Sequence, residues 1–239
     1  MLVTRLPVHH PEYRYPPSPN PYWEKLRAAQ GQVYLDNQTE NHRGNWKSVL
    51  SNAAGHPLDE LHVELGCNGG HVILEWARLN PSHAYLGLDW KFKQIHRAFE
   101  KAQKKGLRNI GFLRAHAIRL GQIFGPSEID HLHLLFPDPW PKKSQWNNRL
   151  ITPEWLREAA SVVHSGGLFE IRTDHSGYFD WMKAALTQVQ DIWQTSSESR
   201  DFYAGRANLH ALEIPEVTLF ERLFIKDGIP IHRLLLRRT

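Results

Sequence analysis

The sequence predicts an α/β fold, in which helices cover both faces of a mostly parallel β-sheet. The main observation is that short apolar runs alternate with segments of helical length from residue 61 onward. Such alternation is typical of βαβ units, whose crossovers join parallel strands. A second observation is that 41% of the 239 residues are hydrophobic. A chain of this size and composition can bury a sizeable core, so we expect one large domain with at most small appendages.

Five short apolar runs are predicted to be strands. In chain order, the predicted strands are 61–66, 84–89, 109–115, 129–136 and 167–174. The first run stops at Gly66, and the fourth leads directly into Pro137. Proline has no amide hydrogen to donate to a strand ladder, so the fourth strand has to end there.

The segments that follow these strands are predicted to be helices. In chain order, the predicted helices are 70–79, 91–105, 117–124, 153–164 and 176–190. The first helix is expected to end at Asn80-Pro81. The second is amphipathic, with an apolar face that consists of Phe92, Ile95, Phe99 and Ala102. Its opposite face carries Lys93, Arg97, Lys101 and Lys105, which form either a solvated surface or a track for RNA.

The two ends of the chain show other patterns. Residues 1–22 contain prolines at positions 7, 11, 16, 17, 19 and 21, and we expect a flexible, proline-rich arm there. Residues 23–239 are expected to form a single domain, whose first part is irregular with short helices near 22–30 and 45–53. At the C-terminus, TLFERLFIK and IPIHRLLLRR are separated by Asp227-Gly228, which indicates a β-hairpin.

The overall composition narrows the functional classes. The net charge is +4 and the pI is about 9.2, which permits a phosphate-bearing partner without requiring one. Cys67 is the only cysteine, so no disulfide forms within the chain and a cytoplasmic location is expected. No apolar run approaches the roughly 18 residues of a membrane helix, and the N-terminus lacks a signal-peptide pattern. No metal is expected, because the chain has a single cysteine and His131 and His133 form no H-x-x-x-H pattern; they are interpreted as packed side chains.

Ligands of parallel α/β sheets bind beyond the carboxyl ends of the strands, so residues just after strands are the first candidates for function. The first strand ends in a turn that contains Gly66, Gly69 and Gly70, and such a turn allows close approach of a ligand to the backbone. Asp89 ends the second strand, 23 residues after Gly66, at about the spacing of acids that bind a ribose diol. Asp89 is alternatively the N-cap of the next helix.

The most unusual stretch is LLFPDPWPKK at 134–143, which follows the fourth strand. Asp138 lies among three prolines, with Trp140 beside it and two lysines after it. An acid, a stacking surface and cations suit a flat base on a phosphate backbone, although a rigid surface turn without a ligand is the alternative. Asp174 ends the fifth strand on the same rim, either as a ligand-binding residue or as the N-cap of helix 176–190.

In order and spacing, these motifs resemble the bacterial tRNA (guanine-N7-)-methyltransferases, which use S-adenosylmethionine. The resemblance covers about residues 60–237 and is carried by VELGCNGG, GLD, LLFPDPWPKK, RTD and TLFE. It implies a Rossmann-like class I methyltransferase fold and methylation of guanine N7 in the variable loop of tRNA. The alternative is a divergent member with weak or lost catalysis that acts as an RNA-binding or partner protein. The sequence does not distinguish a monomer from a homodimer.

The resemblance also implies roles for particular residues, with Asp138 at the catalytic centre. The residues that it assigns to the cofactor are Glu64, Gly66, Gly70, Asp89, His116, Ala117 and Asp138. Those that it assigns to the guanine and the tRNA are Lys142, Arg149, Asp174, Thr218, Phe220 and Glu221.

Three positions depart from the family pattern. Asn68 replaces the middle glycine of the turn, and asparagine tolerates the left-handed conformation that a glycine there would adopt. His116-Ala117 replaces an Asp-Ala pair whose acid accepts from the adenine amino group in such enzymes, and a neutral histidine supplies no charge. The basic run after PDPW is reduced to SQWNNR, in which Arg149 alone matches, so we expect weaker phosphate binding with a shallower salt dependence.

Overall fold

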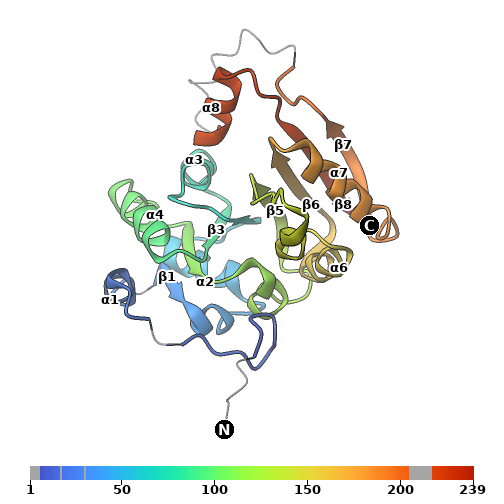
Figure 1. The fold of residues 1–239 in the computed structure, drawn as a ribbon. Coiled ribbons are helices and arrows are strands. Elements are labelled where there is room, and N and C mark those ends of the chain that lie inside the picture. Colours follow the sequence, from blue (N-terminus) through green and yellow to red (C-terminus); the bar gives the residue numbers. More distant parts are fainter. Residues whose placement is uncertain (1–5, 17, 30, 205–216) are drawn as a thin grey trace.

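The fold is described from a computed structural model, for residues 6–16, 18–29, 31–204 and 217–239. These residues form an eight-stranded sheet with the order β1-β4-β3-β2-β5-β6-β8-β7 (Figure 1). The strands are β1 (Val33–Leu35), β2 (Leu61–Leu65), β3 (Ala84–Asp89), β4 (Ile110–Arg114), β5 (Ile129–Leu135), β6 (Val163–Thr173), β7 (Trp193–Ser199) and β8 (His232–Arg238). Strands β1 to β6 pair in parallel, whereas β8 is antiparallel to both β6 and β7.

Helices lie on both faces of this sheet, as predicted. The α-helices are α1 (Pro21–Arg27), α2 (Trp46–Ala54), α3 (Ile73–Leu79), α4 (Phe92–Lys104), α5 (Leu120–Ile123), α6 (Pro153–Val162), α7 (Ser176–Leu186) and α8 (Leu219–Lys226). Three short 3-10 helices are η1 (Asp36–Glu40), η2 (Ala117–Arg119) and η3 (Lys143–Asn148). One core cluster joins α2, α5, α6 and α7 to the sheet, and a second joins α1, α3 and α4 to the opposite face.

The order of the strands determines where a ligand can bind. β2 lies between β3 and β5, and the connections after β2 and after β5 leave the sheet toward opposite faces. In open α/β sheets, the crevice for a ligand lies outside the carboxyl ends of the strands at such a reversal. The glycine turn after β2 and the FPDPW stretch after β5 are therefore neighbours at the carboxyl ends of the central strands.

All five strands predicted from apolar runs are present, as β2 to β6, and the helices predicted between them are α3 to α7. The short edge strand β1 and the strand β7 were not predicted. β7 has a polar surface pattern in which only Trp193 is buried, so it carries no apolar run that would mark it as a strand.

The predicted C-terminal antiparallel pair is confirmed, but its first strand is β7 and not TLFERLFIK. Residues 219–226 form α8 instead. Thr218 accepts a hydrogen bond from the Glu221 amide at 2.9 Å, and the Glu221 side chain accepts from the Thr218 amide at 2.7 Å. This reciprocal capping box fixes a helix start, and the stacked rings of Phe220 and Phe224 continue with the helical i, i+4 spacing.

The described part of the N-terminal arm lies against the domain. Arg119 donates hydrogen bonds to the carbonyl oxygens of Val8 at 2.6 Å and His10 at 2.9 Å. Tyr13 is only 6% exposed. The flexibility expected for residues 1–22 stays a prediction. Across the described ranges, no helix combines the length and apolarity that a membrane crossing requires.

Candidate functional site

The turn after β2 adopts the conformation that a ligand-binding glycine turn requires. Gly66, Asn68 and Gly70 have φ angles of 79°, 50° and 72°, so Asn68 takes the left-handed conformation at the position of the family's middle glycine. At Gly70, an added Cβ would lie 3.0 Å from the Ala98 Cβ, which leaves no space for a side chain. The amides of Gly66 and Cys67 both donate to the Leu88 carbonyl oxygen, at 2.7 and 2.9 Å, and hold the turn against β3.

Asp89 links this turn to the start of α4. Its Oδ2 accepts a hydrogen bond from the Asn68 amide at 3.0 Å, and its Oδ1 accepts from the Lys91 amide at 2.8 Å. The N-cap of α4 is Lys91, without a side-chain cap, so the prediction that Asp89 caps this helix is wrong. The Asp89 carboxylate instead joins the glycine turn to the residue that precedes the helix. Burial raises the pKa of Asp89, and the two amides oppose that shift.

Glu64, near the carboxyl end of β2, has a side-chain oxygen without a hydrogen-bond partner among the described residues. The side chain is 4% exposed, and its Oε2 atom has no hydrogen-bond partner within the described structure. Burial raises its pKa to about 8, although a hydrogen bond from the Ile73 main chain acts in the opposite direction. A buried carboxylate oxygen without a partner is costly, so this atom favours a ligand group that donates a hydrogen bond or carries positive charge.

His116 follows β4 and has one ring nitrogen already engaged. Its Nδ1 accepts a hydrogen bond from the Ile118 amide at 3.3 Å at the start of η2, and its own amide donates to the Tyr15 hydroxyl at 3.1 Å. Burial, together with the charge of Arg114, lowers the pKa of His116. In the neutral ring that accepts at Nδ1, the proton lies on Nε2. The free edge of His116 is therefore a donor, and not the acceptor that an aspartate would provide.

An exposed aromatic surface that sequence reasoning missed lies beside His116. Trp90 follows Asp89 directly and is 55% exposed, and its ring centre is 6.2 Å from that of His116. The Arg114 guanidinium supports this surface from behind, at 5.3 Å from the Trp90 ring and 4.1 Å from the Phe92 ring. The sequence feature that points to this surface is the position of Trp90 immediately after Asp89, the predicted ribose-binding acid.

The FPDPW stretch leaves β5 through a strained turn. Phe136 and Trp140 have φ angles of 53° and 45°, a conformation that costs a non-glycine residue about 1–3 kcal/mol and is concentrated at functional sites. The Phe136 amide donates to the Arg172 carbonyl oxygen at 2.8 Å, which extends the pairing with β6. Asp138 lies between the two strained residues, and its side chain is exposed.

Arg149 supports this turn from within the protein. It is 5% exposed, and its Nε donates to the Pro139 carbonyl oxygen at 2.9 Å. Its guanidinium lies 4.7 Å from the ring centre of Trp146 and 4.9 Å from that of Trp181. These contacts favour a positioning role for Arg149, whereas its predicted contact with tRNA stays a prediction. Lys142, in contrast, is exposed.

Asp174 is not the cap of α7. His175 takes that position, because its Nδ1 accepts from the Tyr178 amide at 3.0 Å. Asp174 is half-buried, and no hydrogen bond or ion pair of its carboxylate is found among the described residues. The capping alternative is therefore wrong, and the carboxylate remains available on the rim.

The T-x-F-E tetrapeptide combines a structural carboxylate with an exposed ring. Glu221 is fully buried, and besides the cap it accepts from Arg172 at 2.8 Å and from the Tyr203 hydroxyl at 3.1 Å. Phe220 is 47% exposed, and its ring lies 6.1 Å from that of Phe136. α8 thus contacts the FPDPW turn, and Phe220 presents an exposed ring beside it.

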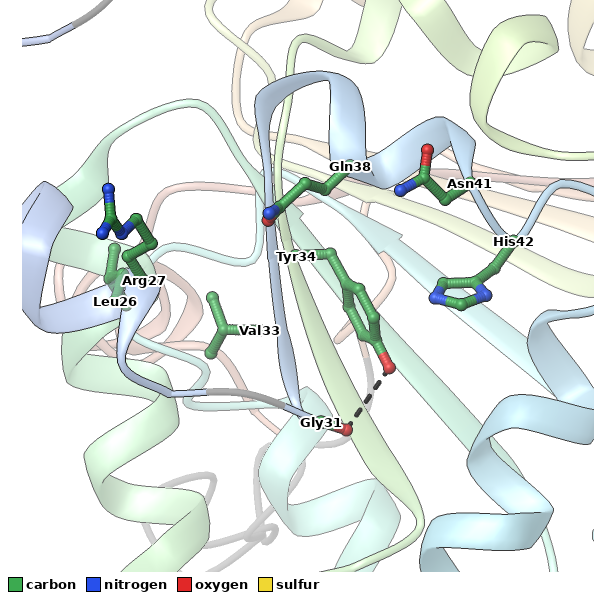
Figure 2. Close-up of a pocket in the computed structure, with 8 residues that line it drawn as sticks. All are labelled: Leu26, Arg27, Gly31, Val33, Tyr34, Gln38, Asn41 and His42. Carbon is green, nitrogen blue, oxygen red and sulfur yellow. Dashed lines mark hydrogen bonds between the residues drawn. The ribbon is translucent and has the colours of Figure 1, made fainter.

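A cavity elsewhere shares none of these residues. A hollow of about 400 Å³ lies beside the edge strand β1. The Tyr34 hydroxyl donates to the Gly31 carbonyl oxygen there at 3.3 Å, and Figure 2 shows the lining residues with this bond as a dashed line. The hollow is lined by Leu26, Arg27, Gly31, Val33, Tyr34, Gln38, Asn41 and His42. It is also remote from the glycine turn in the topology, since β4 and β3 separate β1 from β2.

Known proteins share both the sequence pattern and the fold. Residues 59–234 match a family model described as "Putative methyltransferase". The tRNA (guanine-N(7)-)-methyltransferase of Lachnoclostridium phytofermentans is 32% identical, over 84% of this chain and 89% of that protein. The enzyme of the same name from Bacillus cytotoxicus is 33% identical, over 68% of this chain and 72% of that protein.

Among solved structures, the 16S rRNA methyltransferase KamB has a TM-score of 0.57 at 21% identity, over 80% of this chain and 92% of that chain. At that identity the likeness establishes the Rossmann-like methyltransferase fold alone. The match of the family model and the identity to the curated relatives go further: this chain belongs to the methyltransferase family that includes these tRNA (guanine-N(7)-)-methyltransferases.

Proposed function

We propose that this protein transfers a methyl group from S-adenosylmethionine to N7 of a guanine in the variable loop of tRNA. The observation that carries the proposal is the position of Asp138. Its exposed carboxylate lies between two strained residues at the end of β5, the strand next to the one that bears the glycine turn. The names of the relatives support the same reaction.

The residues at the end of β2 fit the cofactor. The unpartnered Oε2 of Glu64 suits a cationic or hydrogen-bond-donating group, and the left-handed turn from Gly66 to Gly70 allows close approach of a ligand. Asp89 is placed to accept from a ribose diol, and Trp90 offers a flat surface beside His116. When bound, S-adenosylmethionine supplies an electrophilic methyl group on a sulfonium.

The reaction depends on the positioning of the guanine and the methyl group more than on proton transfer. Guanine N7 has a free lone pair and no proton to lose, so no strong general base is needed. The ring becomes cationic as it is methylated, and a carboxylate that accepts from its N–H groups stabilises that charge. Asp138 is suited to this role because Arg149 and the prolines fix its backbone, and a fixed acceptor does not have to reorganise during the reaction.

The substrate side is proposed to involve three described side chains on the rim. Lys142 is exposed and contributes positive charge toward phosphate, Asp174 has a free carboxylate, and Phe220 provides an exposed ring for stacking. Glu221 and Thr218 are proposed to act indirectly, by capping α8. A tRNA substrate and the single cysteine are consistent with the cytoplasmic location expected from the sequence.

The test is methyl transfer from radiolabelled S-adenosylmethionine to an unmodified tRNA transcript, followed by mapping of the methylated nucleotide. We expect N7-methylguanine in the variable loop. Asp138→Ala should abolish transfer while binding of the cofactor, measured by calorimetry, stays nearly unchanged. Asp191→Ala is the matched control, because Asp191 is an exposed aspartate on the loop before β7. Transfer by the Asp138→Ala variant at the normal rate, or a methyl group at another atom, would contradict the proposal.

A further inference from the structure

A cluster of imidazole and carboxylate groups lies at the amino ends of the central strands, at the opposite end of the sheet from the glycine turn. We call it the amino-edge cluster; it consists of Glu60, His62, His83 and His131. Glu60 directly precedes β2 and His83 directly precedes β3, while His62 and His131 are register partners in β2 and β5. None of these residues belongs to the site described above.

The Glu60 carboxylate is the centre of the cluster. Its Oε2 atom lies 3.3 Å from Nε2 of His62, 3.6 Å from Nδ1 of His83 and 3.2 Å from Nε2 of His131. These separations lie at or beyond the long end of ordinary hydrogen bonds. They match the edge of a tetrahedron around Zn²⁺, since ligands at about 2.0–2.1 Å from the metal are about 3.3 Å apart.

The ring orientations separate the ligands from their neighbour. The rings of His62 and His83 are inclined at 66°, so their nitrogen lone pairs can point at one position. The ligand atoms of Glu60, His62 and His83 all lie within 4.8 Å of one another. The ring of His131 is stacked on that of His62, with centroids 4.3 Å apart and an interplanar angle of 3°, so the lone pairs of the two rings lie in separate parallel planes and do not meet at one point. His131 therefore serves as a hydrogen-bond partner of Glu60 and not as a further ligand in this arrangement.

Two ring nitrogens are in states that suit a metal. Nδ1 of His83 is buried and has no hydrogen-bond partner in the described residues. Nδ1 of His62 faces Nε2 of His133 at 3.5 Å, and a histidine that binds metal through one nitrogen commonly engages the other in this way. Packing alone leaves the His83 nitrogen unsatisfied, whereas a metal ion would satisfy it.

The backbone that carries these side chains is held firmly. The Ala84 amide donates to the Glu60 carbonyl oxygen at 2.7 Å, and the Leu61 amide donates to Oδ2 of Asp130 at 2.6 Å. The buried Asn109 donates from Nδ2 to the His83 carbonyl oxygen at 3.0 Å. These bonds fix the starts of β2 and β3 against each other, so a metal would find its ligands largely preorganised.

We propose that Glu60, His62 and His83 form a binding site for a divalent transition-metal ion, with Zn²⁺ as the best match. Two imidazole nitrogens and a carboxylate oxygen are a donor set typical of Zn²⁺, with water at the fourth position. The sequence interpretation expected no metal because it considered His131 and His133 within their own strand and found no H-x-x-x-H spacing there. The sheet brings His83, which precedes β3, to Glu60 and His62 at the start of β2, and spacing within one strand does not reveal this.

The test is titration of the full chain, without a histidine tag and after dialysis against a chelator, with Zn²⁺ and separately with Mg²⁺. We expect one saturable Zn²⁺ site per chain, a rise in Tm on Zn²⁺ binding, and no response to Mg²⁺. Co²⁺ should give the visible absorption of a tetrahedral site. His83→Ala and Glu60→Gln should each weaken Zn²⁺ binding by at least tenfold and remove the Tm shift.

His56→Ala is the matched control, because His56 is an exposed histidine outside the cluster, with its Nδ1 atom 3.0 Å from the Pro57 carbonyl oxygen. Its Zn²⁺ affinity and Tm shift should equal those of the unmodified chain. Glu60→Gln preserves the shape of a partly exposed side chain, so it tests the site even if the His83 variant folds poorly. Absence of saturable Zn²⁺ binding, or unchanged affinity in both cluster variants, would overturn the proposal. An equal loss in the His56 variant would do the same.

Discussion

The Nε atom of Arg149 donates a hydrogen bond of 2.9 Å to the carbonyl oxygen of Pro139, the residue that follows Asp138. Arg149 is the residue that the resemblance matches to the basic run after PDPW, and it is 5% exposed. Its charge is therefore directed at the turn and at the surrounding aromatic rings. This cation therefore holds the backbone next to the candidate catalytic aspartate.

The first prediction is that Arg149→Lys impairs methyl transfer more than it impairs binding of the cofactor. Lysine keeps the charge but lacks the planar fork that reaches a carbonyl oxygen and stacks between rings. Displacement of Asp138 by about 1 Å is expected to lower kcat roughly a hundredfold. Steady-state kinetics with tRNA, combined with a calorimetric titration of S-adenosylmethionine, measures both effects.

Lys142→Ala is the comparison for Arg149, because Lys142 is an exposed cation on the same segment. It should raise KM for tRNA and leave kcat and Tm nearly unchanged. If Arg149→Lys also changes only KM, and the change disappears at high salt, Arg149 contacts phosphate and the positioning role is wrong.

The second prediction concerns the buried carboxylate of Glu221. Glu221→Ala leaves Arg172 without the partner at 2.8 Å and removes the capping box of α8, so we expect a loss of about 3 kcal/mol of unfolding free energy. Urea denaturation measures this loss. Glu198→Ala breaks an exposed pair with Lys183 and should cost less than about 1 kcal/mol. Loss of methyl transfer by the Glu221 variant at full stability would instead indicate a direct contact with guanine.

Much of the fold was predictable because its central strands are rich in apolar residues. β3 (AYLGLD) and β4 (IGFLR) are buried almost throughout, so each reads as a nearly continuous apolar run. β7 lies at the sheet edge with mostly exposed side chains, and its sequence, WQTSSES, carries no such pattern. TLFERLFIK was misassigned because a short apolar run fits either a strand or a helix, and the Thr218–Glu221 capping box that decides between them was not recognised.

The parts of the candidate site that depend only on neighbouring residues in the chain could be predicted. The left-handed turn and the position of Asp138 follow from local chemistry that the chain itself carries. The structural roles of Arg149 and Glu221 could not be predicted, because they depend on contacts that the chain forms only when folded. Arg149 binds the carbonyl oxygen of Pro139, and Glu221 binds Arg172. Trp90 was missed because its position immediately after Asp89 does not by itself distinguish an exposed tryptophan from a buried one.

The third prediction is that His116→Asp binds S-adenosylmethionine more tightly than the unmodified protein. The His116 Nδ1 atom is engaged by the Ile118 amide, so the neutral ring offers only a donor to an adenine amino group. Aspartate keeps an acceptor for that amide and supplies a second, charged oxygen, whose hydrogen bond is worth about 1.5 kcal/mol or more. We expect roughly a tenfold gain in affinity by calorimetry, with a smaller gain for His116→Asn. Equal or weaker binding by both variants would show that His116 does not face the adenine.

The last prediction is a pH dependence of stability that originates at Glu64. Burial raises the pKa of this carboxyl from its ordinary value of 4.5 to about 8 in the folded protein, so the folded state holds a proton that the unfolded state releases. The stability associated with the protonated group is fully present below about pH 4.5, declines between pH 4.5 and 8, and is absent above pH 8.

Urea denaturation of the cofactor-free protein at several pH values should show a decline of roughly a few kcal/mol in unfolding free energy across this window. Glu64→Gln, which cannot ionise, should remove that part of the slope and be relatively more stable at the alkaline end. An identical slope in the variant would assign the pH dependence to other groups and would mean that Glu64 is ionised in the folded protein.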